Sequence, residues 1–228
     1  MREIGNVLIT GGASGLGAAT ADAVAGAGGR PLIIDRLPPV AGAEGVQADL
    51  ADRRAAERAV HGLAESAGGL SAVVTAAGID SCGPLGEVPA EEWERVIEVN
   101  LLGTAAVIRA ALPFLEQTSG TVVTCASTLG LNVAPDATAY CASKFGVVGL
   151  TRALAAETAG RIGVTLLIPG GMRTGFFDGR PEQYKPPPDT GLNDPADVAQ
   201  AIVYALRAPQ GCEMREMVVC HSREGSWP

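Results

Sequence analysis

Near the N-terminus the chain reads Asn6-Val-Leu-Ile-Thr-Gly-Gly-Ala-Ser-Gly-Leu-Gly17. The first five residues of this stretch form a short apolar run that is typical of a buried strand, and the alanine-rich segment after the glycines predicts a helix to about residue 27. Glycines between a strand and a helix allow a tight turn and let the backbone approach a pyrophosphate, which the helix N-terminus attracts. The stretch therefore predicts a dinucleotide site, with a flexible Gly/Ser turn as the alternative. The predicted site residues here are Gly11, Ser14, Gly15, Leu16 and Gly17.

The alternation of strand and helix continues to the C-terminus. Apolar runs predict further strands at 31–35, 46–50, 70–75, 120–125, 164–168 and 216–220, and helices at 52–66, 89–115, 138–159 and 195–207. Continuous apolar strands indicate a parallel sheet that is covered on both faces. We therefore predict an α/β fold, with residues 1–228 forming a single Rossmann-type doubly wound domain. The proline-rich loop at about 171–193 is predicted to be a substrate lid.

Acidic residues follow the second and third predicted strands. Asp35 lies eighteen residues after Gly17, where a carboxylate accepts hydrogen bonds from the adenosine ribose and repels a 2′-phosphate. Asp49 and Leu50 are predicted to lie beside the adenine, although a helix N-cap is an equal alternative for Asp49. We therefore favour NAD(H) as the cofactor. Arg36 keeps NADP(H) open, because its guanidinium would reach a 2′-phosphate if the loop turns inward.

The composition argues against several other classes of protein. A formal net charge of -8 over 228 residues is unfavourable for binding nucleic acid. The apolar runs fall short of the roughly 20 residues that span a bilayer, and the first residues lack a signal-peptide pattern, so we expect no membrane partner. The five cysteines contain no CxxC pair, so we expect neither a metal site nor a disulfide framework, and a cytoplasmic location fits best.

A candidate catalytic group lies in Tyr140-Cys-Ala-Ser-Lys144, thirteen residues after Ser127. Residues four apart share one face of a helix, and an ammonium near a phenol favours the phenolate, which lowers the phenol pKa from roughly 10. Such a tyrosine can donate and accept a proton near neutral pH. Ser127 would then hydrogen-bond the reacting oxygen. Each residue also has a structural alternative: Tyr140 could pack in the core, Lys144 could be a solvated charge, and Ser127 could cap a turn.

Taken together and in order, the motifs resemble the short-chain dehydrogenase/reductase family. The motifs that carry the resemblance are Thr10-Gly-x-x-x-Gly-x-Gly17, Asn100, Ser127, Tyr140-x-x-x-Lys144 and Pro169-Gly170. The resemblance implies hydride transfer with Tyr140 as the general acid/base, Lys144 holding the nicotinamide ribose, and Asn100 supporting a water in a proton relay. It also implies cofactor contacts from Ala76, Ala77, Gly78, Tyr140, Lys144, Pro169, Gly170 and Thr174. Finally, it implies a homodimer or homotetramer formed through the helices at 89–115 and 138–160.

These residues predict an enzyme that interconverts a small to medium apolar secondary alcohol and its carbonyl compound. The predicted substrate walls are Leu129, Val133, Gly171, Met172, Phe176 and Phe177. Two alternatives stay open: an NADPH-dependent 3-oxoacyl or ketone reductase, and a dinucleotide-sensing protein without turnover. The chain departs from the family pattern at Thr75, where an asparagine is usual, and after the last strand, where a glycine pair is usual. These departures put the Thr75 strand contact and the usual C-terminal subunit contacts in doubt.

Overall fold

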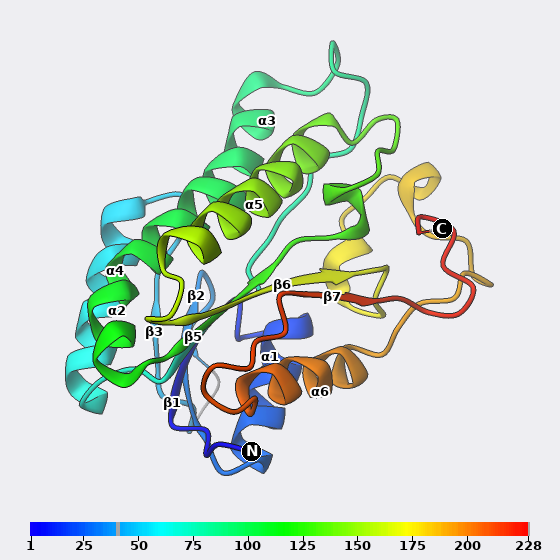
Figure 1. Ribbon diagram of the computed structural model, residues 1–228. Helices are drawn as coiled ribbons and strands as arrows, with labels where there is room; N and C mark the ends of the chain where they lie inside the picture. The colour runs from blue at the N-terminus through cyan, green and yellow to red at the C-terminus, as the bar shows by residue number, and fades with distance from the viewer. Residues whose placement is uncertain (40–41, 228) are drawn as a thin grey trace.

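The computed structural model describes every residue except 40, 41 and 228. Its strands form a seven-stranded sheet in the order β3-β2-β1-β4-β5-β6-β7, in which all neighbours are parallel (Figure 1). The strands are β1 Asn6–Thr10, β2 Arg30–Asp35, β3 Gly45–Gln47, β4 Ala72–Thr75, β5 Thr121–Cys125, β6 Gly163–Pro169 and β7 Glu216–Val219. The predicted doubly wound α/β fold is therefore confirmed.

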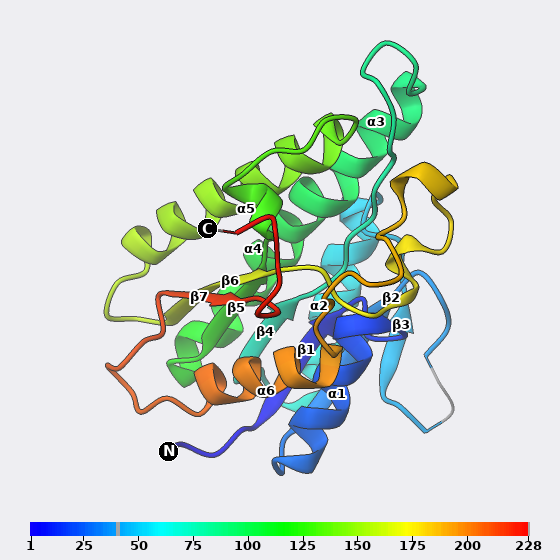
Figure 2. The same ribbon diagram turned by 90° about the vertical axis from the view of Figure 1, so that its right-hand side faces the viewer.

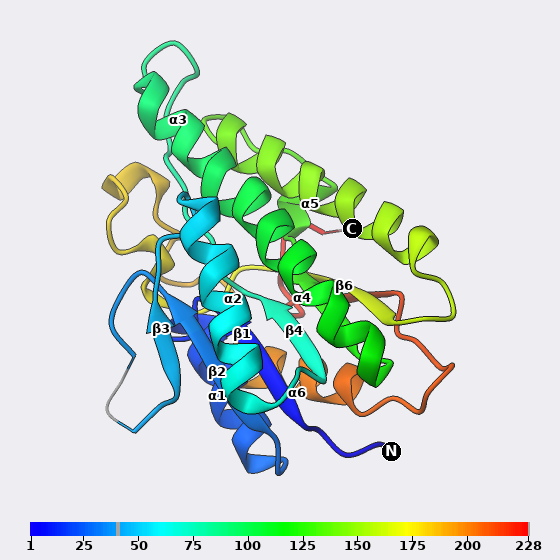
Figure 3. The ribbon, with the colours of Figure 1, turned by 90° about the vertical axis from the view of Figure 1, so that its left-hand side faces the viewer.

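Helices cover both faces of the sheet. Helices α1 (Gly15–Gly26) and α6 (Pro195–Leu206) pack against each other on one face. The opposite face carries α2 (Arg53–Ala67), α4 (Thr104–Thr118) and α5 (Thr138–Glu157), which lie side by side in Figure 3. Asp194 caps α6 by accepting a hydrogen bond from the Ala196 N–H, as the Asp-Pro sequence at its start predicts.

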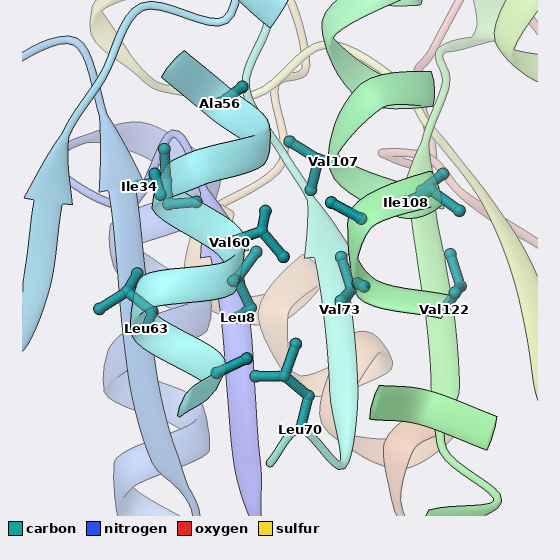
Figure 4. Packing of buried hydrophobic residues seen from close by; sticks show 14 of the residues in the cluster. Leu8, Ile34, Ala56, Val60, Leu63, Leu70, Val73, Val107, Ile108 and Val122 are labelled. Carbon is teal, nitrogen blue, oxygen red and sulfur yellow. The ribbon is translucent and has the colours of Figure 1, made fainter. Parts of the chain in front are cut away.

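Two layers of apolar side chains hold the helices to the two faces of the sheet. Consecutive residues of β1 pack into different layers. Leu8 points toward α2 and α4, where it packs in a fully buried cluster with Val60 and Val107 (Figure 4). Ile9 points the other way, into the cluster that includes Val24 of α1 and Ile202 of α6. Because side chains alternate along a strand, a continuous apolar run is what a sheet covered on both faces requires.

The helical region at 90–118 differs from the predicted single helix. It begins as α3 (Ala90–Ile97), widens into a π-helix at Glu98–Gly103, and continues as α4 beyond Pro113 to Thr118. A proline removes one backbone donor, and buried residues such as Leu115 keep the helix packed on the sheet past this point. The 29-residue run is long and apolar enough to cross a membrane by length and composition alone, but 56% of its apolar window is buried inside the molecule.

The strand order reverses between β1 and β4. The chain moves from β1 outward to β2 and β3, and then returns to place β4 on the other side of β1. Ligands of open α/β sheets bind beyond the carboxyl ends of the strands at such a reversal. The loops after β1, β4, β5 and β6 meet there, and the C-terminal segment after β7 approaches the same end (Figure 2).

Candidate active site

A cavity of about 980 Å³ opens at the carboxyl ends of the strands. Its lining includes 18 of the 19 predicted site residues, drawn from the glycine turn, both acidic positions and the segments after β4, β5 and β6. The exception is Asn100, which is 1% exposed and lies behind the wall. The strand ends therefore bring together residues that are far apart in the sequence.

The glycine turn needs its glycines for conformation and for space. Gly11 and Gly15 have φ angles of 73° and 52°, in the left-handed region that favours glycine. A Cβ at Gly17 would lie 2.1 Å from the Gly11 carbonyl oxygen, and one at Gly11 would press on the Ala77 backbone. Helix α1 begins at Gly15, so its free N–H groups and positive dipole end face this cradle. The turn fits a dinucleotide pyrophosphate.

Asp35 is fixed at the end of β2 by backbone contacts. It is 8% exposed, and its carboxylate accepts hydrogen bonds from the N–H groups of Ala13 and Leu37 at 3.0 and 2.9 Å. An ionised carboxylate offers about four acceptor sites, so acceptor capacity remains for ribose hydroxyls. The side chain of Arg36 is exposed and lines the same part of the cavity.

Asp49 is held by an ion pair that the sequence did not predict. Its carboxylate lies 2.6 Å from Arg95 and also accepts from the Ala51 N–H at 3.0 Å. Partial burial raises the pKa of this carboxyl, but the hydrogen bonds from Arg95 and Ala51 outweigh that effect, so the pKa is lowered overall. The cap of α2 is Asp52, which accepts from the Ala55 N–H. The N-cap alternative for Asp49 was therefore wrong.

Lys144 and Tyr140 lie close together on α5, as their spacing predicts. The Lys144 ammonium is 5.5 Å from the centre of the Tyr140 ring and donates a hydrogen bond to the Cys125 carbonyl oxygen at 2.9 Å. Lys144 is 4% exposed, and this burial lowers its pKa. The carbonyl at the end of β5 thus holds the ammonium beneath the tyrosine.

In the protein alone, the pKa of Tyr140 is raised, not lowered. Burial at the cavity wall disfavours the phenolate, and the acidic groups of Cys125 and Asp80 add to that effect. Ser127 and Arg180 oppose it. The expected lowering of the phenol pKa by Lys144 is therefore not seen in the protein without cofactor, because burial outweighs the opposing contributions of Ser127 and Arg180.

Asn100 lies in the π-helix, where its side chain is fully engaged. Its Oδ1 accepts from the Ile79 N–H at 2.8 Å, and its amide donates to the Ile79 carbonyl and the Ser143 hydroxyl at 2.9 and 3.0 Å. The Ser143 hydroxyl in turn donates to the Tyr140 carbonyl at 2.8 Å. Asn100 therefore ties the segment after β4 to the catalytic helix. Its support of a relay water stays a prediction.

The segments after β4 and β6 both line the cavity. Gly78 lies beside the catalytic groups, since a Cβ at this position would be in van der Waals contact, at 3.5 Å, with both the Lys144 ammonium and the Asn100 Oδ1. Thr174 lies next to Gly15, where a Cβ would be 3.5 Å from its side chain, and it caps a short 3₁₀ turn at Gly175–Phe177. The doubt about Thr75 is borne out, because its buried hydroxyl has no hydrogen-bond partner within the described chain.

The segment at 171–193 covers part of the cavity and supplies most of the predicted substrate walls. Leu129, Gly171, Met172, Phe176 and Phe177 line the cavity as predicted. Val133 does not, because it is 75% exposed on the outer surface, and the neighbouring Ala134 lines the wall instead. The role of this segment as a lid stays a prediction.

Charged residues at the substrate end were missed, among them Asp80, Arg180 and Glu224. Asp80 and Arg180 form an ion pair with an N–O distance of 2.6 Å, and both line the cavity. Glu224, in the C-terminal segment, accepts from the Gly171 N–H at 2.9 Å and from Ser226. The wall is therefore more polar than the predicted apolar pocket. A local sequence signal for these residues was lacking, since their partners are distant in the chain.

Comparisons with known proteins agree with this geometry. A family model described as short chain dehydrogenase matches residues 5–185. Glycine betaine reductase ATRR from Emericella nidulans is 32% identical over 231 residues, which cover 93% of this chain but only 18% of that protein. 2-(S)-Hydroxypropyl-CoM dehydrogenase 3 from Xanthobacter autotrophicus is 31% identical over 225 residues, which cover 88% of each chain.

Solved structures share the whole architecture. An alcohol dehydrogenase from the archaeon Thermococcus sibiricus, complexed with 5-hydroxy-NADP, superposes with a TM-score of 0.86 at 26% identity and covers 99% of both chains. A 3-ketoacyl-(acyl-carrier-protein) reductase from Brucella melitensis, complexed with NADH, gives a TM-score of 0.85 at 26% identity, covering 97% of this chain and 98% of that one. Proteins similar to this chain thus bind either nicotinamide dinucleotide.

Proposed function

The chain belongs to the short-chain dehydrogenase family, and we propose that it interconverts a secondary alcohol and a carbonyl compound with NAD(H), with Tyr140 transferring the proton. The chain is an oxidoreductase that acts on CH–OH groups with a nicotinamide cofactor. The observation that supports the rest is the position of Tyr140 at the cavity wall, with the Lys144 ammonium 5.5 Å from its ring.

The reaction needs a hydride and a proton at neighbouring atoms. The nicotinamide ring supplies or accepts the hydride when the cofactor is bound. Tyr140 donates its phenolic proton to the carbonyl oxygen in reduction and removes the alcohol proton in oxidation. Ser127 already accepts a hydrogen bond from the Leu129 N–H at 3.2 Å. Its own O–H remains to donate to the reacting oxygen and stabilise charge that develops there.

Lys144 acts through its fixed charge. Its hydrogen bond to the Cys125 carbonyl keeps the ammonium under the phenol ring, so the phenolate that forms during reduction lies beside a positive charge. This contribution matters because burial raises the pKa of Tyr140 and makes the phenolate costly. We expect loss of the Lys144 charge to slow proton transfer in both directions.

The preference for NAD(H) is supported by Asp35. Its carboxylate is held in place by two backbone N–H groups at the point where β2 ends, and a negative charge there repels a 2′-phosphate. Arg36 lines the same region and supports the second candidate, an NADPH-dependent reductase of 3-oxoacyl compounds or other ketones. Titration of the protein with NADH and NADPH distinguishes the two candidate functions, because tighter binding of NADPH would exclude the NAD(H)-dependent enzyme.

The direct test is turnover of a panel of secondary alcohols and ketones, followed by nicotinamide absorbance. The wild-type protein and a Tyr204→Phe control, whose altered residue is 56% exposed on α6, should turn over the same substrates. Tyr140→Phe should lose at least about a hundredfold in kcat, the usual contribution of a general acid/base. Equal activity in the Tyr140→Phe protein would remove Tyr140 from this role.

We also propose that the protein forms a homodimer or homotetramer through the helical face at 89–115 and 138–160. Leu102 and Phe145 support this, since they are large apolar residues 39% and 43% exposed on this region. Light scattering should give a mass that is a multiple of 23.1 kDa. A species of 23.1 kDa alone would exclude the proposal.

A further inference from the structure

We propose that the cavity contains a subsite for a second hydroxyl group of the substrate, built from Asp80 and Arg180, so that the preferred substrates are diols, polyols and the corresponding hydroxy ketones. This inference rests on the proposed function and narrows its substrate class. It replaces the expectation of a purely apolar substrate.

The two residues come from opposite sides of the site. Asp80 follows Gly78 in the segment after β4, and Arg180 lies in the segment at 171–193. Their side chains are only 5% and 18% exposed, and the ion pair between them spans 2.6 Å. Both line the cavity that contains Tyr140 and Lys144.

Aromatic rings place the pair close to the reacting group. The Arg180 guanidinium lies 5.0 Å from the centre of the Phe176 ring and 4.7 Å from that of Phe177. The Phe176 ring is in turn 5.6 Å from the Tyr140 ring. Phe176 therefore lies near both the Tyr140 ring and the Arg180 guanidinium, so a substrate that meets Tyr140 shares this part of the cavity with the pair.

Each partner of the pair keeps one unused polar atom. Asp80 uses Oδ2 to accept from Arg180 and from the Cys82 thiol, and Arg180 also donates to the Tyr184 carbonyl. In contrast, Asp80 Oδ1 and Arg180 Nε are buried without a hydrogen-bond partner among the described residues. They are two of only four such side-chain atoms in the described part of the chain. Buried polar groups are normally paired, so these two point to a ligand.

The chemistry of the two atoms selects the ligand. Asp80 Oδ1 needs a donor and Arg180 Nε needs an acceptor, and a hydroxyl group supplies both. A carboxylate would satisfy Arg180 but repel Asp80, whereas an ammonium would do the reverse. An apolar group would leave both atoms unpaired at a cost in free energy. Because both atoms are buried, a hydroxyl group binds them only when the Asp80–Arg180 pair rearranges to admit it.

The test compares matched substrates that differ by one hydroxyl: 2-butanol with 2,3-butanediol, and 2-butanone with 3-hydroxy-2-butanone. We expect kcat/KM of the wild-type protein to favour the hydroxylated member by about tenfold or more, the usual effect of a hydrogen bond to a charged group. Arg180→Lys keeps the positive charge but removes Nε, so the ratio should fall toward one. Arg173→Lys is the matched control, because Arg173 pairs with Asp194 in the same segment at 61% exposure and should keep the ratio.

Different results would refute the hydroxyl subsite and the proposed function. Equal kcat/KM for both members in the wild-type protein, or an unchanged ratio in Arg180→Lys, overturns the hydroxyl subsite but leaves the proposed function intact. Absence of turnover with every member overturns the proposed function and the subsite with it. If Arg180→Lys does not fold, Asp80→Asn provides the same test, since it removes the charge of the Oδ1 acceptor and should also lower the ratio.

Discussion

Asn100→Ala perturbs the contact that joins the two sides of the candidate active site. The asparagine side chain makes three hydrogen bonds of 2.8–3.0 Å, two to the Ile79 backbone and one to the Ser143 hydroxyl. Ile79 precedes Asp80 of the substrate wall, and Ser143 precedes Lys144. Alanine would remove the partner of the Ile79 N–H and carbonyl groups. It would also remove the bond to the Ser143 hydroxyl, which keeps its bond to the Tyr140 carbonyl, in a region where Asn100 is 1% and Ser143 is 0% exposed.

The magnitude follows from the number of bonds. Each buried hydrogen bond contributes about 1 kcal/mol net, so we expect the free energy of unfolding to fall by about 3 kcal/mol. For a chain of this size that corresponds to a fall in Tm of roughly 6–12 °C. Activity should fall as well, because α5 and the segment after β4 lose their common support.

Urea unfolding at neutral pH, together with kcat on the best substrate, measures both effects. Asn132→Ala is the control, since Asn132 is exposed and makes one bond, to the Ser226 carbonyl at 2.6 Å. The control should lose less than about 1 kcal/mol. A similarly small loss in Asn100→Ala would refute the reasoning, because it would mean that the three bonds do not stabilise the site.

Three further predictions concern the cofactor and the proton. Asp35→Asn should raise the affinity for NADPH relative to NADH in a fluorescence titration, since it removes the charge that repels a 2′-phosphate. An unchanged ratio of the two affinities would show that Asp35 does not select against NADPH. Gly17→Ala should abolish dinucleotide binding, because its Cβ would lie 2.1 Å from the Gly11 carbonyl oxygen, whereas Gly62→Ala in α2 meets nothing within 4 Å and should bind normally. Burial raises the pKa of Tyr140. Alcohol oxidation needs the phenolate, so its rate should increase from about pH 6 to 9, whereas carbonyl reduction needs the phenol and should keep a constant rate over this range. An oxidation rate that does not depend on pH would contradict this prediction.

Most of the fold could be predicted because its signals are local. The strands at β1, β5 and β6 match their apolar runs to within one residue at each end, and Asp194-Pro195 marks the start of α6. The predicted cofactor residues reach one cavity because the carboxyl ends of parallel strands converge. The third strand was predicted at 46–50, but β3 ends at Gln47, where the chain turns toward Asp49 and its partner Arg95.

The remaining features depend on contacts between distant residues. Asp80 and Arg180 are 100 positions apart, and Glu224 meets Gly171 across 53 positions. The π-helix at Glu98–Gly103 arises where Asn100 binds the backbone of Ile79, which the helical pattern of the segment does not reveal. The pKa of Tyr140 could not be predicted from the Tyr-x-x-x-Lys spacing, since that spacing gives the neighbour but not the burial.

In the proposed reaction, a hydride passes directly between a carbinol carbon and the nicotinamide ring in this cavity. Turnover of a secondary alcohol that carries deuterium on its carbinol carbon, followed by mass spectrometry of the reduced cofactor, tests it most directly. We predict one deuterium per molecule of cofactor reduced. Reduced cofactor that contains no deuterium would contradict the account.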